Sequence, residues 1–435
     1  MHENDLLMKR GEGQMRNLGC CRRKPRISVA AFLFLSMAMP LASPAVAQSL
    51  TVRFAPADYV YAQKVKRPGL GYRGVSPYYD LMLQSVAFVN SSPRAVTLEG
   101  GVIEILRGGD VVQSQMIDPA DIENDLALIA QLRGMEFDSA LDVLLSAGEL
   151  LNGVEVSSTL ELKPNSAAVA SQFYFVLRGL PDSVRVRIHG KDDRGDRVEG
   201  GATLAVRQFE SKNEYRFPLE AGAWYVTSYP DVKGHHRWTP STEFALDIVM
   251  LDSRGSIYSG NAPQYSVKSW DQFYGYNKKV LAAADGKVVK VVDTVEFPLD
   301  VWRRQDGESR ADYEQRAGQM QMKLFLAEGA DPITVAGGNH VVIEHAGGEY
   351  SFYGHLAYDG IRVKKGDVVK RGQHIAGLGG TGERPYAHLH FQLYDRADSL
   401  FGHSLPVGFG NAAINHPAAE LSPEVFEPGY FVIVE

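Results

Sequence analysis

The sequence predicts a mainly β protein built from two parts of different character. Short runs of alternating apolar and polar residues, bounded by turn-forming residues, fill much of the chain, and this pattern is typical of half-buried antiparallel strands. The 43 glycines, 20 tyrosines and 19 phenylalanines favour strands joined by tight turns. With 435 residues, 45% hydrophobic and 22% charged, the chain is long enough for two folded domains and is not broadly disordered.

Residues 1–47 have the pattern of a secretory signal peptide. A basic cluster at 22–26 precedes the apolar run 27–41, and the small residues Ala45 and Ala47 follow it. The apolar run is shorter than the roughly 20 residues that a membrane-spanning helix needs. We therefore expect cleavage after Ala47, no stable membrane insertion afterwards, and a periplasmic or secreted mature protein.

The mature chain would be acidic and free of cysteine. Without residues 1–47 it contains 38 Lys and Arg against 49 Asp and Glu, a net charge of −11. A negative surface repels the phosphates of nucleic acids and anionic lipids, so the charge disfavours both as partners. The sequence indicates no particular protein partner.

Residues 48–215 are expected to form an N-terminal β-sandwich of immunoglobulin-like type. Alternating runs such as 101–106, 172–177 and 184–188 are separated by polar and glycine-containing turns. Between them, the spacing of Ile122, Leu126, Ile129 and Leu132 predicts a helical insertion within 118–151. This part has one histidine and no cluster of ligand residues, so we interpret it as a structural or binding module.

The part of the chain from 221 to 400 is where we expect the chemistry. Ten of the twelve histidines and all four tryptophans lie beyond Ala221, and catalytic or ligand histidines must converge whereas structural ones scatter. Residues 386–393 read as a strand, and its period of two places His388 and His390 on one face. A His-x-His pair alone is weak evidence for a metal site.

Six motifs around this pair follow one another in a definite order. They are Phe244-Ala245-Leu246-Asp247-Ile248, Ala284-Asp285-Gly286-Lys287-Val288, Gly338-Asn339-His340-Val341, Tyr353-Gly354-His355-Leu356, Lys364-Lys365-Gly366-Asp367-Val368-Val369 and His388-Leu389-His390-Phe391. This succession resembles the M23 family of zinc metallopeptidases, also called LytM or lysostaphin-type, most of which cut peptide cross-links in bacterial cell walls. The matching order runs from about Ala245 to Leu393, less one insertion.

The resemblance implies an antiparallel M23-type peptidase core and a zinc-dependent endopeptidase acting on stem or cross-link peptides of peptidoglycan. It assigns Asp247 and His390 as zinc ligands and places His355 and His388 beside the metal-bound water. Zinc with three protein ligands keeps a fourth position for a water, whose pKa falls toward about 7. The chain has no His-Glu-x-x-His motif, so histidines are expected to do the acid–base work.

The third zinc ligand is open at this stage. The family's first ligand is a histidine four residues before the aspartate, and Glu243 stands there. On an extended strand, Glu243 would share a face with Asp247; alternatively His236 or His235 could reach the site, at most one of them if they lie on a strand. We favour His236, because histidine is the more usual zinc ligand. If the metal has been lost, the chain is instead a degenerate LytM-like scaffold or activator of other hydrolases. A lipoyl-type carrier is a third, weaker interpretation of 363–373.

Two further segments complete the predicted layout. An insertion at 297–336 interrupts the peptidase domain, and 310–328 within it has helical composition, with Tyr313, Ala317, Met320 and Leu324 spaced for one face. We interpret this helix as a surface element packing on the sheet, with a lid over a groove as the alternative. Residues 401–435 are expected to form an irregular C-terminal tail.

Overall fold

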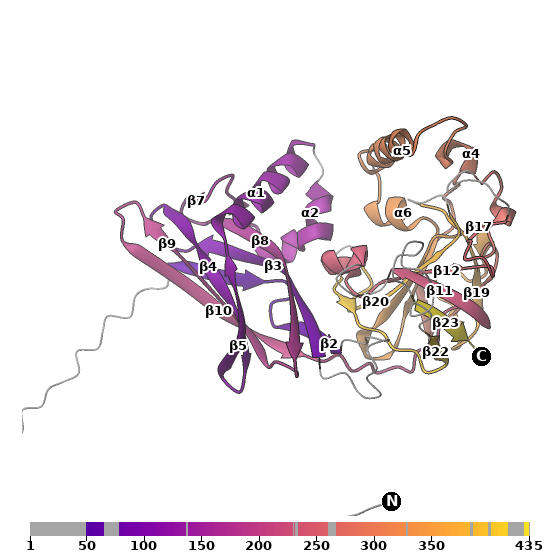
Figure 1. The fold of residues 1–435 in the computed structure, drawn as a ribbon, viewed down its shortest axis with the longest axis horizontal. Helices are drawn as coiled ribbons and strands as arrows, with labels where there is room; N and C mark the ends of the chain where they lie inside the picture. Colours follow the sequence, from indigo (N-terminus) through magenta and orange to yellow (C-terminus); the bar gives the residue numbers. More distant parts are fainter. Residues whose placement is uncertain are drawn as a thin grey trace, which may run out of the picture. The chain divides into compact units, whose positions relative to one another are not determined.

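The structure is a computed structural model that describes residues 49–64, 78–135, 138–228, 230, 234–259, 267–327, 329–382, 386–398, 402–415 and 430–434. The predicted signal peptide, 1–47, lies outside the described residues. Within them the fold is mainly β, as the sequence predicts (Figure 1). No helix in these stretches combines the length and the apolarity needed to cross a lipid bilayer.

The N-terminal half contains a ten-stranded sheet with the order β5-β4-β9-β10-β2-β3-β8-β6, in which β1 also pairs with β3 and β7 with β4. The predicted alternation is seen on β9, where Val184, Val186 and Ile188 are buried and Arg187 between them is exposed. The immunoglobulin-like type remains a prediction. The strands are β1 Leu50–Phe54, β2 Tyr59–Lys64, β3 Tyr78–Asn90, β4 Val96–Arg107, β5 Asp110–Ile117, β6 Glu155–Val156, β7 Glu161–Leu162, β8 Ser166–Arg178, β9 Ser183–Asp192 and β10 Arg197–Arg207.

The predicted helical insertion in this half is confirmed as three helices, α1 Pro119–Gly134, α2 Asp138–Leu145 and α3 Ala147–Leu151. Helix α1 begins after Asp118, whose carboxylate accepts a hydrogen bond from the Ala120 amide and so caps the first turn. The four apolar residues that predicted the helix are all buried in the core of this half. They anchor α1 against β8.

The C-terminal half contains a second ten-stranded sheet, all antiparallel, with the order β18-β14-β15-β16-β20-β12-β11-β23-β22 and β21 on β20. Strands β13, β19 and β17 form a separate three-stranded sheet. The bounds are β11 Gly222–Ser228, β12 Leu246–Met250, β13 Lys279–Leu281, β14 Gly286–Val292, β15 His340–Glu344, β16 Tyr350–Gly354, β17 Leu356–Ile361, β18 Val368–Val369, β19 His374–Leu378, β20 Leu389–Tyr394, β21 Ser404–Leu405, β22 Ala412–Asn415 and β23 Tyr430–Val434.

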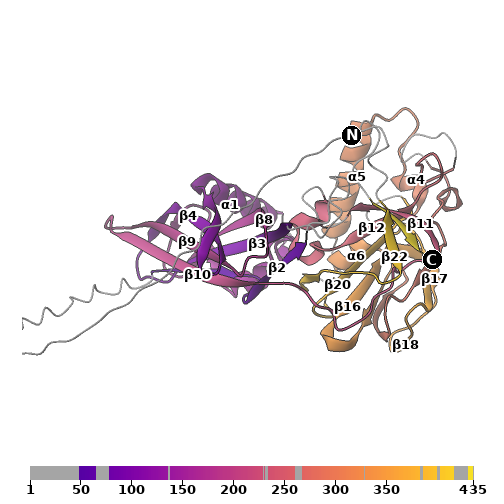
Figure 2. The same ribbon diagram turned by 60° about the horizontal axis from the view of Figure 1, so that its bottom comes forward.

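The middle of this second sheet is the part that matters for chemistry. Strand β20 lies between β16 and β12, and Figures 1 and 2 show β20, β12 and β11 side by side. Trp224, Tyr353 and Phe391 are fully buried beneath these strands. The rigid central strands therefore provide a fixed base for side chains on the opposite face.

The insertion at 297–336 contains α4 Leu299–Trp302, α5 Arg310–Phe325 and α6 Pro332–Gly337. The helix predicted within 310–328 is confirmed as α5, and of its predicted apolar face Tyr313 is buried, Ala317 and Met320 are half-buried and Leu324 is 44% exposed. Helix α5 contacts α6. Four short 3₁₀ helices, η1 His235–Trp238, η2 Pro240–Thr242, η3 Trp270–Gln272 and η4 Ala346–Gly348, complete the described elements.

The described parts of the C-terminal tail, 402–415 and 430–434, are not irregular as predicted. Strands β21, β22 and β23 all join the second sheet, and β23 pairs with β11 from Gly222 to Val226. Glycines and asparagines in 408–415 suggested irregular structure, whereas the apolar run Tyr430–Val434 lies between β11 and the edge strand β22.

Candidate metal centre

Asp247 and His390 occupy the centre of the candidate site. They lie directly opposite each other on β12 and β20, and Oδ1 of Asp247 is 3.1 Å from Nδ1 of His390. Both side chains are almost entirely buried. Strand register alone brings these two residues, 143 positions apart in sequence, into contact.

Two further histidines reach the same carboxylate from η1. Nε2 of His236 lies 2.9 Å from Oδ2 of Asp247, and Nε2 of His235 lies 3.5 Å from the same oxygen. We expected at most one of the two histidines to approach the site, because we assumed that both lie on a strand. That assumption is wrong, because a 3₁₀ turn does not alternate its side chains between two faces. The His236 side chain is 11% exposed and that of His235 is 63% exposed.

The hydrogen bonds around His390 test whether these groups suit a metal cation. Nε2 of Gln392 donates to the Ser241 carbonyl, so Oε1 of Gln392 is left to accept a hydrogen bond from Nε2 of His390, 2.7 Å away. In the neutral imidazole Nδ1 then carries no proton, yet it faces a carboxylate oxygen of Asp247. Two electron-pair donors at 3.1 Å require a proton or a metal cation between them. The donor set of two imidazoles and one carboxylate fits zinc.

A second pair of histidines lies beside this cluster. The rings of His355 and His388 are 4.1 Å apart, and the His355 ring is 6.0 Å from that of His390. Nδ1 of His355 donates to the Thr381 carbonyl at 2.7 Å, and Nδ1 of His388 donates to the Tyr386 carbonyl at 3.1 Å. These bonds fix the tautomer of both neutral rings, so each Nε2 can accept a proton.

The backbone of His355 has φ of 58°, the left-handed region that non-glycine residues seldom adopt. Its amide donates to the Gly337 carbonyl at 2.7 Å, which holds the residue in this conformation. His355 lies between β16 and β17, directly after Gly354, which pairs with His390 of β20. The strained conformation therefore positions its imidazole beside His388 rather than continuing the strand.

Burial and charge set the protonation of these groups. Burial would raise the pKa of the Asp247 carboxyl, but attraction to His236 and hydrogen bonds with His236 and His390 outweigh it and hold the pKa well below its usual value. Burial, with the charge of His390, lowers the pKa of His355 to about 4. Burial, with the charge of His355, lowers the pKa of His388 to about 3. Near pH 7 the cluster therefore combines a carboxylate with neutral imidazoles at 355 and 388.

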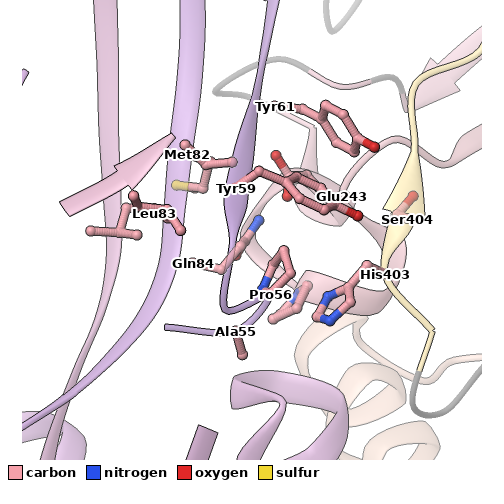
Figure 3. Close-up of a pocket in the computed structure, with 13 residues that line it drawn as sticks. Ala55, Pro56, Tyr59, Tyr61, Met82, Leu83, Gln84, Glu243, His403 and Ser404 are labelled. Carbon is pink, nitrogen blue, oxygen red and sulfur yellow. The ribbon is translucent and has the colours of Figure 1, made fainter. Parts of the chain in front are cut away.

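Glu243 does not share a strand face with Asp247, because β12 begins only at Leu246 and Glu243 has helical backbone angles. Oε1 of Glu243 instead accepts from Nη1 of Arg237 at 2.5 Å. Figure 3 shows Glu243 at a small cavity of about 30 Å³ that it shares with Gln84 and His403. That cavity has room for about one water molecule, and it is not lined by His235, His236 or His390.

Sequence reasoning did not find three groups that support the cluster: Gln392, Thr381 and Arg237. Gln392 lies two residues beyond His390 on the same strand, so the period of two could have identified it. Thr381 offers only a backbone carbonyl, which leaves no sequence signal. Arg237 is buried through contacts with residues far away in sequence.

Comparison with known proteins gives a family match for part of the C-terminal half. Residues 327–401 match the family model of Peptidase family M23. This match agrees with the resemblance indicated by the motifs. The matched segment contains His355, His388 and His390.

One curated relative and two solved structures illustrate the similarity. The peptidoglycan DD-endopeptidase ShyB of Vibrio cholerae serotype O1 is 51% identical over 59 residues, which is 14% of this chain and only 13% of that protein. The catalytic domain of the prophage-encoded M23 protein EnpA from Enterococcus faecalis is 16% identical, with 47% of this chain and 95% of that domain covered at a TM-score of 0.24. The catalytic domain of lysostaphin from Staphylococcus simulans is 19% identical, with 43% and 88% covered at a TM-score of 0.21.

Proposed function

We propose that this protein is an exported zinc-dependent endopeptidase that hydrolyses stem or cross-link peptides of bacterial peptidoglycan. The observation that carries the proposal is the contact between Asp247 and His390, in which a carboxylate oxygen lies 3.1 Å from Nδ1 of an imidazole whose Nε2 faces Gln392, in a buried site. Such a pair needs a proton or a metal cation between its two atoms, and His236 adds a third ligand atom beside the same carboxylate.

In this proposal His236, Asp247 and His390 hold the zinc, with His235 as the exposed alternative to His236. Bound zinc would supply an acidified water and would polarise the carbonyl of the peptide bond. Gln392 orients His390 by accepting a hydrogen bond from its Nε2, and Gln392 is held in turn by donating to the Ser241 carbonyl. Supporting hydrogen bonds of this kind set the direction of a ligand's electron pair.

His355 and His388 act as the acid–base and charge-stabilising pair. Both rings are buried and neutral near pH 7, and their Nδ1 protons are held by backbone carbonyls. Nε2 of one ring can therefore take a proton and later return it to the amine of the cleaved bond. A ring that has taken up the proton also stabilises negative charge on the carbonyl oxygen.

The substrate class is supported by the relative whose printed name is a peptidoglycan DD-endopeptidase. The predicted signal peptide, 1–47, would bring the enzyme to the cell wall, in the periplasm or outside the cell. The acidic mature chain argues against nucleic acid as a partner.

The degenerate-scaffold alternative depended on Glu243 standing where the family has a histidine. The position of His236, 2.9 Å from Asp247, weighs against this alternative because it restores a third donor. We therefore do not favour a non-enzymatic role.

The test is digestion of purified peptidoglycan sacculi by the mature chain, residues 48–435, loaded with zinc. Chromatography and mass spectrometry should detect new muropeptide ends produced by peptide-bond cleavage, and none with Asp247→Asn. Sacculi left intact by zinc-loaded, folded protein would contradict the proposed activity. Release that persists after removal of the metal would contradict the zinc dependence.

A further inference from the structure

Arg237 is the most unusual side chain near the site that the proposed chemistry leaves unused. It follows His236 in η1, and it is completely buried. Its Nη2 donates to Oδ1 of Asp80 at 2.6 Å, and its Nη1 donates to Oε1 of Glu243 at 2.5 Å. Asp80 belongs to β3 in the N-terminal half, 157 residues away.

The N-terminal half holds the backbone of Arg237 as well. Nε2 of Gln84, also on β3, donates to the Arg237 carbonyl at 2.9 Å. Nε2 of Gln172 on β8 donates to the carbonyl of the next residue, Trp238, at 3.0 Å. The guanidinium also lies over the rings of Tyr174 and Phe244, 5.8 and 5.0 Å from their centres.

The buried ion pairs of Arg237 with Asp80 and Glu243 are not an efficient source of folding stability by themselves. Removing a guanidinium and two carboxylates from water costs several kcal/mol per ion, and a well-packed apolar group often does as well. However, a planar guanidinium that donates to two carboxylates is fixed closely in both position and orientation. We therefore look for the role of these buried ions in the residues whose positions they fix.

The residue they hold in place is His236. Helix η1 has only four residues; at its start the Arg237 amide donates to the Gly234 carbonyl, and at its end the Thr239 amide donates to the His236 carbonyl. A single short turn has little rigidity of its own. Adjacent Cα atoms are about 3.8 Å apart, so fixing Arg237 also fixes the backbone from which the His236 imidazole extends.

We infer that Arg237 is a positioning residue for the metal centre, and that Asp80 of the N-terminal half completes the zinc site by holding Arg237 and, through it, His236. The inference rests on the proposed function, because it takes His236 as a zinc ligand. It gives the N-terminal β-sheet domain a role in assembling the site, beyond that of a spacer.

The experiment measures zinc affinity of the mature chain by competition with a chromophoric chelator, which does not depend on turnover. Asp80→Ala should weaken zinc binding about tenfold or more, the range seen when groups behind metal ligands are removed. Arg237→Lys keeps the charge but not the fork and should also weaken it. The visible spectrum of the Co²⁺-loaded protein should change in both variants, because it reports ligand geometry at the metal.

Glu104→Ala is the matched control. Glu104 lies on β4 in the same half, is nearly buried, and accepts from Arg185 at 2.7 Å and Arg187 at 2.8 Å, so it too is a carboxylate held by arginine. Its loss should lower the melting temperature without changing zinc affinity. Near-UV circular dichroism of the zinc-free proteins checks that each variant is folded. If Asp80→Ala and Arg237→Lys fail to fold, Gln84→Met, which leaves the Asp80–Arg237 pair in place and removes the bonds of Gln84 to the Arg237 carbonyl and to Glu243, decides with a smaller loss of affinity.

The outcomes separate the inference from the proposed function. Folded variants that bind zinc as tightly as the wild type would overturn the inference and leave the proposed function intact. Variants with unchanged zinc affinity and faster muropeptide release would also overturn the inference. The contact between Asp80 and Arg237 would then inhibit the enzyme rather than position a zinc ligand. A folded wild type that binds no zinc would overturn both.

Discussion

Oδ1 of Asp247 and Nδ1 of His390 lie 3.1 Å apart, between directly opposed residues of two central antiparallel strands. Neither side chain can move far, because both are buried and the strands are paired on either side. In the proposed metal site, the pair therefore forms a preformed half. Residues from other elements need only supply the remaining ligands.

The first prediction is one zinc per mature chain, with binding abolished in His390→Ala. Two remaining donors hold zinc poorly, and loss of this imidazole also leaves Gln392 without its partner. Elemental analysis after dialysis gives the stoichiometry. His374→Ala, on β19 of the other sheet, should keep its zinc. Metal retained in His390→Ala would remove His390 from the ligand set.

The second prediction ranks the candidates for the third ligand. His236→Ala should lower zinc affinity at least tenfold, because its Nε2 is 2.9 Å from Asp247 and the side chain is nearly buried. His235→Ala should have a smaller effect, because that side chain is 63% exposed and 0.6 Å further away, at 3.5 Å against 2.9 Å. Glu243→Gln keeps an oxygen acceptor for Arg237 and should also cost less than His236→Ala. Isothermal titration with zinc would measure all three, and a reversed order would reassign the ligand.

The third prediction concerns the two histidines that lie beside the proposed metal. His355→Ala and His388→Ala should retain zinc but lose about 10²- to 10⁴-fold in the rate of muropeptide release. Because both would serve one transition state, the double variant should lose less than the product of the single losses. Zinc content is measured in the same samples. Wild-type rates in either variant would exclude that histidine from the chemistry, and zinc loss would make it a ligand.

The sequence predicted the parts of the site that depend on local periodicity. A strand at 386–393 was expected, and β20 indeed carries His390 and its partner Gln392 on one face, although His388 precedes the first residue of the strand. Similarly, the apolar spacing in 118–134 predicted α1 and its buried face. These features repeat with the period of the backbone, so they can be read from neighbouring residues.

The parts that could not be predicted depend on where an element begins or on distant contacts. The even offset between Glu243 and Asp247 was uninformative, because β12 starts at Leu246 and the residues before it form 3₁₀ turns. The partnership of Arg237 with Asp80 joins two halves of the chain. No local pattern indicates such a pair, because each residue looks like an ordinary surface charge until the fold buries it.

The last prediction is a loss of stability in mild acid that depends on His340. This histidine is fully buried on β15, where Nδ1 bonds to the Gly338 carbonyl and the ring stacks on Phe352. Burial, helped by the charge of Lys290, lowers its pKa to about 4, although the bond to Gly338 and the charge of Asp331 act in the opposite direction. An unfolded histidine titrates near 6.5.

The sign follows from which state binds the proton. Below about pH 6.5 the unfolded chain binds a proton at His340, whereas the folded chain binds it only near pH 4. The contribution of neutral His340 to the free energy of unfolding is therefore fully present above pH 6.5 and is lost as the pH falls toward 4. The full interval corresponds to the order of 3 kcal/mol in the free energy of unfolding. His340→Phe, which keeps an aromatic ring against Phe352, should therefore show a flatter dependence on pH. Urea unfolding of the zinc-free proteins at pH 7.5 and 4.5 measures this, and metal removal prevents zinc release from adding to the slope. Equal slopes for variant and wild type would mean that His340 is already protonated in the folded protein or does not titrate in this interval.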